Sequence, residues 1–226
     1  MALSLRVDIV SDVLCPWCYI GLRRFQQALK MLQPQFEQVE VSWHPYRLLP
    51  ATIQPMHKKE MYMAKFGPDK FEKMKAMMLK EGQSCGIAFN YSDDAMVGPT
   101  TDAHRLIAWV PKEKQNQLVE LLFAAYHEKG LLISDPKTLV DCATACGLDG
   151  SAVFQFLQSS EGRAELEHDI ESARQEFNVL GGVPHFVFTI KGRVSEAKAV
   201  VSGGQAPDYF RLMIERAIEK AQMPSM

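Results

Sequence analysis

The order in which strand and helix patterns follow one another constrains the fold of this 226-residue chain more than any other feature. Alternating apolar residues predict strands, and apolar residues spaced by three or four predict helices. The expected elements are a strand at 5–10, a helix at 16–32, a strand at 39–43, a helical block over 56–177, strands at 185–190 and 197–201, and a helix at 206–221. A long helical block therefore separates a strand–helix–strand segment from a strand–strand–helix segment.

The two outer segments together make up the minimal thioredoxin arrangement. We therefore predict an α/β protein in which a thioredoxin fold is interrupted by an all-helical insertion domain. The discontinuous thioredoxin-like domain would comprise residues 1–54 and 178–226, and the insertion residues 55–177. Whether the last helix of the insertion packs on the thioredoxin sheet is left open.

Composition and charge exclude several classes of function. The 25 Lys and Arg residues nearly balance the 27 Asp and Glu residues, giving a net charge of −2. Without a basic stripe the chain is not expected to bind nucleic acid. No apolar run approaches the roughly 20 residues of a membrane span, and the N-terminus lacks the apolar core of a signal peptide. We therefore expect a cytoplasmic protein with no membrane partner.

The segment Cys15-Pro16-Trp17-Cys18 carries the chemistry of the chain. It follows a predicted strand and opens a predicted helix, where backbone N–H groups and the helix dipole stabilise a thiolate. Cys15 lies nearest the helix end and solvent and is the expected attacking thiol, whereas Cys18 lies one turn inside and would resolve the mixed disulfide. Pro16 stiffens the turn, and Trp17 presents an apolar face to the substrate.

The remaining cysteines offer an alternative reading of this motif. Cys142 and Cys146 form a second pair, so a four-cysteine zinc site with Cys15 and Cys18 is conceivable. We instead expect Cys142 and Cys146 to be small core residues on one face of a helix, and we predict no bound metal. Cys85 has no evident partner. Five cysteines in a reducing cytosol argue against a structural disulfide framework.

A proline directly before the third predicted strand is the second candidate element of the site. In a thioredoxin-type fold a proline at this position is held cis against the Cys-x-x-Cys segment, which indicates Pro184, although a plain loop proline is the alternative. In the cis interpretation the backbone of Val183 is free to pair with an extended substrate. His185 could stabilise the Cys15 thiolate or point to the opposite face of the sheet.

Four further residues are weighed as ligand contacts or as structural residues. Arg105 could bind a glutathione or peptide carboxylate, or form a structural ion pair. Ser202 and Gly203 could offer an anion site at a helix N-terminus, or Ser202 could cap that helix. Asp12 could relay protons, or serve as a loop or capping residue.

Several motifs together resemble the DsbA superfamily, and within it the cytosolic FrnE-like dithiol–disulfide oxidoreductases. They occur in order along nearly the whole chain: Ser11-Asp-Val-Leu-Cys-Pro-Trp-Cys-Tyr-Ile-Gly21, Trp43-His-Pro-Tyr-Arg-Leu-Leu-Pro50, Ala103-His-Arg-Leu106, Gly182-Val-Pro184 and Ser202-Gly-Gly-Gln205. The resemblance implies a thioredoxin fold with a helical insertion, Cys15 as nucleophile, Cys18 as resolving thiol and Pro184 as the cis proline.

This branch is also similar to 2-hydroxychromene-2-carboxylate isomerases and kappa-class glutathione transferases, which usually carry serine at the attacking position. Cysteine at both positions favours redox chemistry. Two departures from the family pattern are Pro99-Thr-Thr-Asp102, where Asn-Thr is usual, and His185, where an aromatic residue is common. The first departure lies directly before Ala103-His-Arg-Leu106. It weakens the case for assigning the family's ligand contacts on this helix to the present chain.

The sequence thus predicts a thiol–disulfide oxidoreductase or isomerase acting on protein or small-molecule disulfides. A glutathione-dependent isomerase or transferase acting on a small electrophile is the alternative. No tightly bound cofactor is expected, glutathione is a candidate co-substrate, and the chain would be a monomer or a homodimer.

Overall fold

The chain divides into two compact units. The computed structural model describes residues 3–192 and 195–223. One unit comprises Met1–Ser11, Trp17–Tyr46 and Glu171–Met226, and the other comprises Asp12–Pro16 and Arg47–Ile170. The five-residue segment that contains Cys15 therefore belongs with the second unit.

The first unit is built on a four-stranded sheet in the order β2-β1-β5-β6. β1 pairs in parallel with β2 and antiparallel with β5, and β5 pairs antiparallel with β6. The strands and the helices that pack on the sheet are β1 (Leu3–Ser11), α1 (Pro16–Leu32), β2 (Phe36–Pro45), β5 (His185–Lys191), β6 (Glu196–Ser202) and α9 (Pro207–Gln222), with a short 3₁₀ turn, η1 (Gln33–Gln35), before β2.

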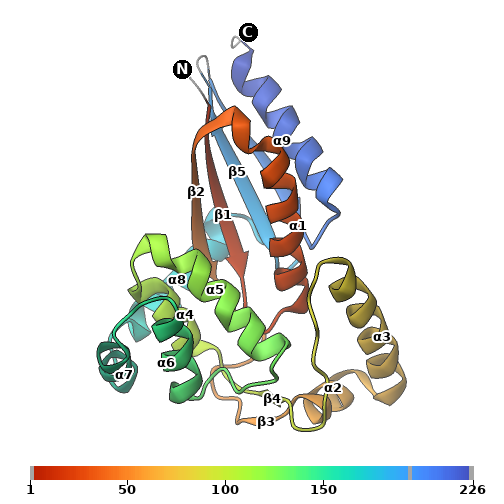
Figure 1. The fold of residues 1–226 in the computed structure, drawn as a ribbon, viewed down its shortest axis with the longest axis vertical. Helices are drawn as coiled ribbons and strands as arrows, with labels where there is room; N and C mark the ends of the chain where they lie inside the picture. Colours follow the sequence, from red (N-terminus) through yellow and green to blue (C-terminus); the bar gives the residue numbers. More distant parts are fainter. Residues whose placement is uncertain (1–2, 193–194, 224–226) are drawn as a thin grey trace. The chain divides into compact units, whose positions relative to one another are not determined.

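Helices α1 and α9 lie side by side on one face of this sheet (Figure 1). An aromatic cluster joins the two layers: Phe25 of α1 contacts Phe186 and Phe188 of β5 and Phe210 of α9, with ring centroids 5.6–6.1 Å apart. All four rings are buried. Each buried aromatic side chain removes a large apolar surface from water, so this cluster is a main source of stability for the unit.

The opposite face of the sheet is covered near the C-terminal end of β1. There Val10 packs with Val179 and with Ala173, which lies in the C-terminal part of α8 (Arg163–Glu176). The last helix of the insertion thus packs on the sheet through its final turn. Further along β1, Asp8 is buried on this face and pairs with Arg6 and His44, at 2.8 and 2.9 Å.

The second unit is mostly helical. Its helices, the last of which ends in the first unit, are α2 (Lys58–Phe66), α3 (Pro68–Ser84), α4 (Thr101–Trp109), α5 (Lys112–His127), α6 (Pro136–Ala145), α7 (Gly150–Gln158) and α8. Prolines begin α3 and α6, where a missing N–H costs no hydrogen bond. The side chains of Asp135 and Asp149 cap α6 and α7 by accepting backbone N–H bonds.

The sequence analysis predicted an all-helical insertion, and in this detail it was wrong. Two-residue strands β3 (Met56–His57) and β4 (Met96–Val97) pair antiparallel within it. Segments this short have no readable two-residue period, because at least four residues are needed to tell strand alternation from a helix pattern.

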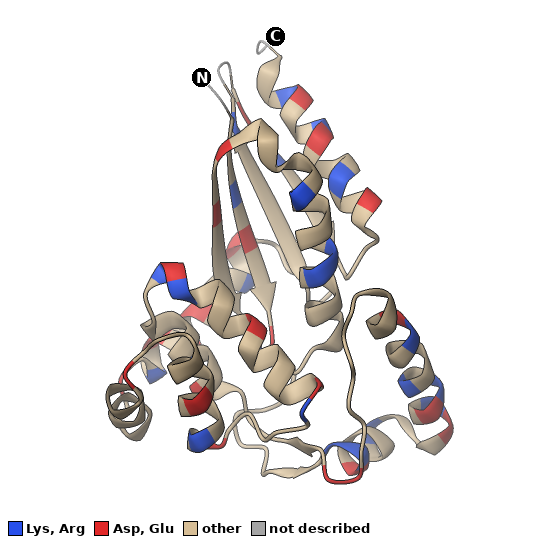
Figure 2. Cartoon of the chain, viewed as in Figure 1, with Lys and Arg blue, Asp and Glu red and all other residues tan. Residues whose placement is uncertain are grey.

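The described residues carry their charges in mixed fashion. Figure 2 shows basic and acidic positions interleaved along the ribbons of α3 and α9, as expected for a nearly neutral chain. Among the helices in the described part of the chain, none combines the length and hydropathy needed to cross a membrane.

Candidate active site

The two cysteines of the Cys-x-x-Cys segment lie at the start of α1. The helix begins at Pro16, so Cys15 is the residue immediately before it and Cys18 lies in its first turn. Neither residue is joined in a disulfide. Cys15 is the more exposed of the two, as expected, but both are buried, at 6% and 2% of their surface. The first turn of α1 contains no acidic residue, so no carboxylate there opposes a thiolate at the positive end of the helix dipole.

Cys15 lies at the end of a tight turn that leads into α1, and hydrogen bonds to Asp12 hold this turn. The backbone N–H of Cys15 donates to the carbonyl of Asp12 at 3.0 Å. The carboxylate of Asp12 accepts the N–H of Leu48 at 2.7 Å and that of Leu14 at 3.3 Å. His104 Nε2 lies 3.4 Å from the same carboxylate. The structure therefore gives Asp12 the loop-capping role, and a role in proton relay stays a prediction.

The Val183–Pro184 peptide bond is cis, which confirms the prediction for Pro184. The carbonyl of Pro184 accepts the N–H of Gly203 at 2.8 Å. A Cβ placed on Gly21 of α1 would lie 3.1 Å from Pro184 Cγ, so the ring packs directly against this helix. The cis proline is thus held against the helix that contains Cys18.

The glycine turn after β6 packs on the first turn of α1. A Cβ on Gly204 would lie 3.0 Å from the carbonyl oxygen of Trp17 and 3.1 Å from its ring, so only glycine fits here without displacement. Arg24 donates to the carbonyl of Gly204 at 2.6 Å, and Gly203 has a φ of 82°. Substrate contacts by Pro16, Trp17 and Val183 stay predictions.

His185 points to the sheet face opposite α1. Its neighbour Phe186 packs on Phe25 of α1, and successive strand residues face opposite sides. The His185 imidazole lies 3.0 Å from the hydroxyl of Ser202, its cross-strand partner. Burial lowers the pKa of His185, so its neutral form is favoured. Of the two alternatives left open by the sequence, the structure shows the opposite-face orientation.

Ser202 is not at a helix N-terminus. It is the last residue of β6, whereas α9 begins at Pro207 with Ala206 as its N-cap. The predicted capping by Ser202 and the helix-terminus anion site with Gly203 are therefore both misplaced, because β6 extends further than its sequence pattern indicated.

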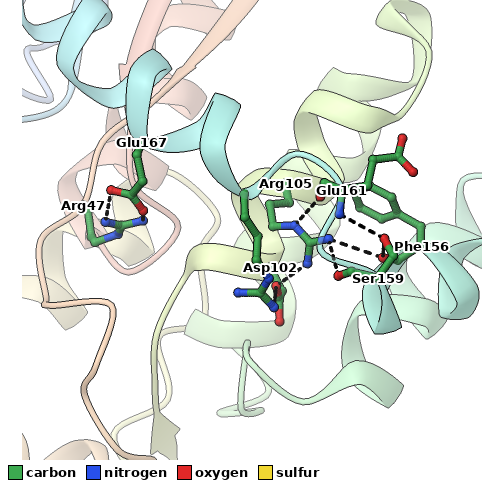
Figure 3. A network of polar contacts seen from close by, with 8 residues as sticks. Arg47, Asp102, Arg105, Phe156, Ser159, Glu161 and Glu167 are labelled. Carbon is green, nitrogen blue, oxygen red and sulfur yellow. Dashed lines mark hydrogen bonds and ion pairs between the residues drawn. The ribbon is translucent and has the colours of Figure 1, made fainter.

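Arg105 is a buried structural residue (Figure 3). Its guanidinium forms a 2.6 Å ion pair with Asp102. The remaining hydrogen bonds go to the carbonyls of Glu161 at 2.7 Å, Ser159 at 2.9 Å and Phe156 at 3.3 Å. The ion pair that the sequence analysis gave as the alternative is present, and every guanidinium nitrogen has a protein acceptor. Binding of a ligand carboxylate by Arg105 stays a prediction.

The cysteines outside the motif lie in the helical unit. Burial raises the pKa of Cys142 to about 11 and also raises that of Cys146, so both favour the thiol form. Cys85 is partly buried, with its sulfur 3.5 Å from the hydroxyl of Ser84. In the described ranges no three or more His, Cys, Asp or Glu residues are grouped so that they could hold a metal ion.

Sequence reasoning missed a group of residues that surrounds the Cys15 turn within the helical unit. His127 of α5 is buried, and its Nε2 lies 2.9 Å from the carbonyl of Val13. Lys58, the first residue of α2, is also buried. Its neighbour Lys59 is only partly buried and pairs with Asp93 at 2.7 Å. No local signal distinguishes the buried lysine from its partly exposed neighbour.

Comparison with known proteins gives consistent results over the length of the chain. A family model described as a DSBA-like thioredoxin domain matches residues 6–215. The curated protein YwbO of Bacillus subtilis (strain 168), described as uncharacterized, is 23% identical over 225 residues, which cover 97% of this chain and 98% of that protein.

Two solved structures extend the comparison. The probable DsbA oxidoreductase SCO1869 from Streptomyces coelicolor superposes with a TM-score of 0.82 and 26% identity, over 98% of this chain and 93% of that one. The cytosolic disulfide reductase DsbM from Pseudomonas aeruginosa has a TM-score of 0.60 and 19% identity, over 96% and 100%. The second likeness concerns the fold alone.

These matches confirm the predicted DsbA-like thioredoxin fold, and they indicate a thiol–disulfide oxidoreductase. The chain belongs to the family of DSBA-like thioredoxin domains.

Proposed function

We propose that this protein exchanges disulfides through the Cys15–Cys18 dithiol, with Cys15 as the attacking and Cys18 as the resolving thiol. The observation that carries the proposal is the placement of two cysteines at the N-terminus of α1, one just before the helix and one in its first turn. A thiolate on Cys15 meets the backbone N–H groups at the start of the helix, and Cys18 follows within one turn. The cis Pro184 packed against the same helix supports the proposal.

The reaction proceeds by two exchanges. The Cys15 thiolate attacks one sulfur of a substrate disulfide, a new S–S bond forms, and the other substrate sulfur leaves as a thiolate that takes up a proton. Cys18 then loses its proton and attacks the sulfur of Cys15, which releases the second substrate sulfur. The substrate gains two electrons and two protons, and the protein is left with a Cys15–Cys18 disulfide. The same steps in reverse oxidise a dithiol substrate.

The direction of exchange follows from the reduction potential. In a reducing cytosol we expect the dithiol to be the resting form, which suits a reductase or an isomerase. Glutathione is then the proposed co-substrate that returns the disulfide to the dithiol. A potential of about −270 mV supports reduction, and one of about −120 mV supports oxidation. Assignment to the FrnE-like branch rests on the sequence resemblance.

Cysteine variants test the proposal. Cys15→Ser should abolish the reduction of insulin by the dithiol form, because no attacking thiolate remains. Cys18→Ser should retain the first exchange and accumulate the mixed disulfide, visible as a mass increase that dithiothreitol removes. Cys85→Ser is the matched control, since this partly exposed thiol lies outside the motif, and it should keep full activity. A Cys15→Ser variant with wild-type activity would refute the proposal.

A further inference from the structure

His127 is a polar side chain in aromatic surroundings. It is the last residue of α5 and is buried. Its ring contacts those of Tyr126, Phe89 and Phe123, with centroids 4.7, 5.4 and 5.9 Å from its own. A phenylalanine would fill such a site without the cost of burying two ring nitrogens. The reason for a histidine must therefore lie in its polar contacts.

The carbonyl of Val13 is a partner that a phenylalanine could not bind. His127 Nε2 lies 2.9 Å from this oxygen. A carbonyl only accepts hydrogen bonds, so Nε2 carries the proton and donates it. Burial, followed by the charge of Lys58, lowers the pKa of His127 well below its usual value, which leaves the imidazole neutral. Both residues are buried, so water does not readily replace this bond if the donor is removed.

The peptide between Val13 and Leu14 is the central peptide of the turn that ends at Cys15. The turn is closed by the Cys15 N–H, which donates to the Asp12 carbonyl at 3.0 Å. His127 binds the carbonyl of the central peptide. The N–H of the same peptide, on Leu14, donates to the Asp12 carboxylate at 3.3 Å. Both polar groups of one peptide plane are thus bonded, and these bonds resist rotation of that plane.

Rotation of the central peptide would redirect the chain at Cys15. Turns of types I and II differ by a rotation of this peptide of roughly 180°, and type II needs a positive φ at its third residue, here Leu14. Among the described residues other than glycine, only Asn178 has a positive φ, so the full rotation has not occurred. Partial rotations change the direction in which the chain leaves the turn. Cys15 can compensate little, because a residue before a proline is largely confined to extended conformations.

The turn and both of its anchors belong to the helical unit. This unit comprises Asp12–Pro16 and Arg47–Ile170. Its second anchor is the N–H of Leu48, which donates to the Asp12 carboxylate at 2.7 Å. That anchor is a backbone group, whereas His127 uses its side chain. Of these two contacts, the one from His127 is therefore the one that a substitution can remove.

We propose that His127 is a positioning residue for Cys15. Its imidazole N–H holds the Val13 carbonyl, and thereby the turn from which the thiol attacks a disulfide. The inference deepens the proposed function and rests on it. Attack requires aligned reacting atoms, and a displacement of about 1 Å can lower a rate by about 10²-fold. Since loss of one hydrogen bond moves the turn only in part, we expect attack by Cys15 to slow by about tenfold.

The test compares His127→Phe, which keeps an aromatic ring and loses the donor, with His127→Gln, which loses the ring and keeps an N–H of similar reach. Both are made in a Cys18→Ser background, where the first exchange is not followed by resolution. The mixed disulfide that Cys15 forms with dithiobis(nitrobenzoate) is followed over time by peptide mass spectrometry. His127→Phe should react about tenfold more slowly than the parent, and His127→Gln should retain most of the parent rate.

A matched control separates positioning from loss of stability. Leu139→Ala opens a cavity in the core of α6, in the same unit but away from the turn and its contacts. It should lower the midpoint of thermal unfolding and leave the rate of Cys15 unchanged. Slowing equal to that of His127→Phe would mean that the rate follows the stability of the unit, and it would overturn the inference.

The other outcomes separate the hydrogen bond from packing. A His127→Phe variant that reacts at the parent rate overturns the inference, and so does equal slowing in His127→Phe and His127→Gln. NMR of the ring nitrogens needs no variant: a proton on Nδ1 of His127 in place of Nε2 also overturns it. Any reactive thiol can attack this small reagent. A protein that shows the expected rates but reduces no insulin therefore contradicts the proposed function and leaves the positioning role of His127 standing.

Discussion

Replacement of Lys58 by Met should remove a pH dependence of stability that the wild-type protein carries. Burial lowers the pKa of Lys58 from 10.5 to about 7, which is a lowering of about 3.5 pH units. At 1.36 kcal/mol per unit, this lowering corresponds to a free-energy cost of about 5 kcal/mol for burying the charged side chain. Solvent screening reduces this cost little because Lys58 is 2% exposed.

The sign follows from proton binding. Between about pH 7 and pH 10.5 the unfolded chain holds the Lys58 proton and the folded chain does not, so the free energy of unfolding rises with pH across this window. Below about pH 7 both states hold the proton, and the full cost of the buried charge applies. Met fills a similar volume without a proton to bind. The difference in stability, wild type minus Lys58→Met, should therefore increase by up to about 5 kcal/mol from pH 7 to pH 10.5.

Urea unfolding of the disulfide form at several pH values measures this difference. The disulfide form is chosen because a thiolate on Cys15 would add its own pH dependence. The ionisation of tyrosines and of the other lysines is shared by both proteins and cancels in the difference. A difference that stays flat between pH 7 and pH 10.5 would show that Lys58 is solvated or paired, and it would refute the reasoning from burial.

Three further substitutions follow from the packing. Gly21→Ala should lower stability by about 1–3 kcal/mol in thermal unfolding and reduce disulfide exchange, because its Cβ would lie 3.1 Å from Pro184; unchanged values would mean that this contact can relax. Arg105→Met should cost about 3–5 kcal/mol in urea unfolding, since it removes a buried guanidinium that donates to the Asp102 carboxylate and to three carbonyls; no loss would show that Arg163, which also contacts Asp102, and water replace it. Asp135→Ala should cost about 1 kcal/mol in urea unfolding through loss of the N-cap of α6, and no loss would show that water replaces the cap.

Local signals explain the parts of the site that the sequence predicted correctly. Pro16 at the first helical position and Pro34 just past the end mark α1, which spans Pro16–Leu32 as predicted. Pro184 became a candidate only after the element order indicated a thioredoxin fold, and its cis bond follows from that position in the fold. Element order and helix boundaries are thus readable where proline and glycine mark the ends of elements.

Contacts between distant segments explain the errors. Ser202 resembles a helix cap in sequence, but pairing with His185 extends β6 up to it, and the N-cap falls on Ala206. Lys58 resembles a solvent-exposed residue, but α5 supplies the Tyr126 carbonyl and ring that bury it, 68 residues further along the chain. Neither partner can be inferred from the residues beside Ser202 or Lys58, because tertiary packing overrides local preference.

The assignment of Cys15 to the helical unit changes how its reactivity is understood. In the sequence, Cys15 belongs to the βαβ segment, and the helix dipole alone accounts for an active thiolate. In the structure, the turn from Asp12 to Pro16 groups with the helical unit, whose Leu48 N–H binds the Asp12 carboxylate and whose His127 binds the Val13 carbonyl. Substitutions at the end of α5 that remove the His127 contact can therefore shift the turn that carries Cys15 while leaving the sheet, α1 and Pro184 intact.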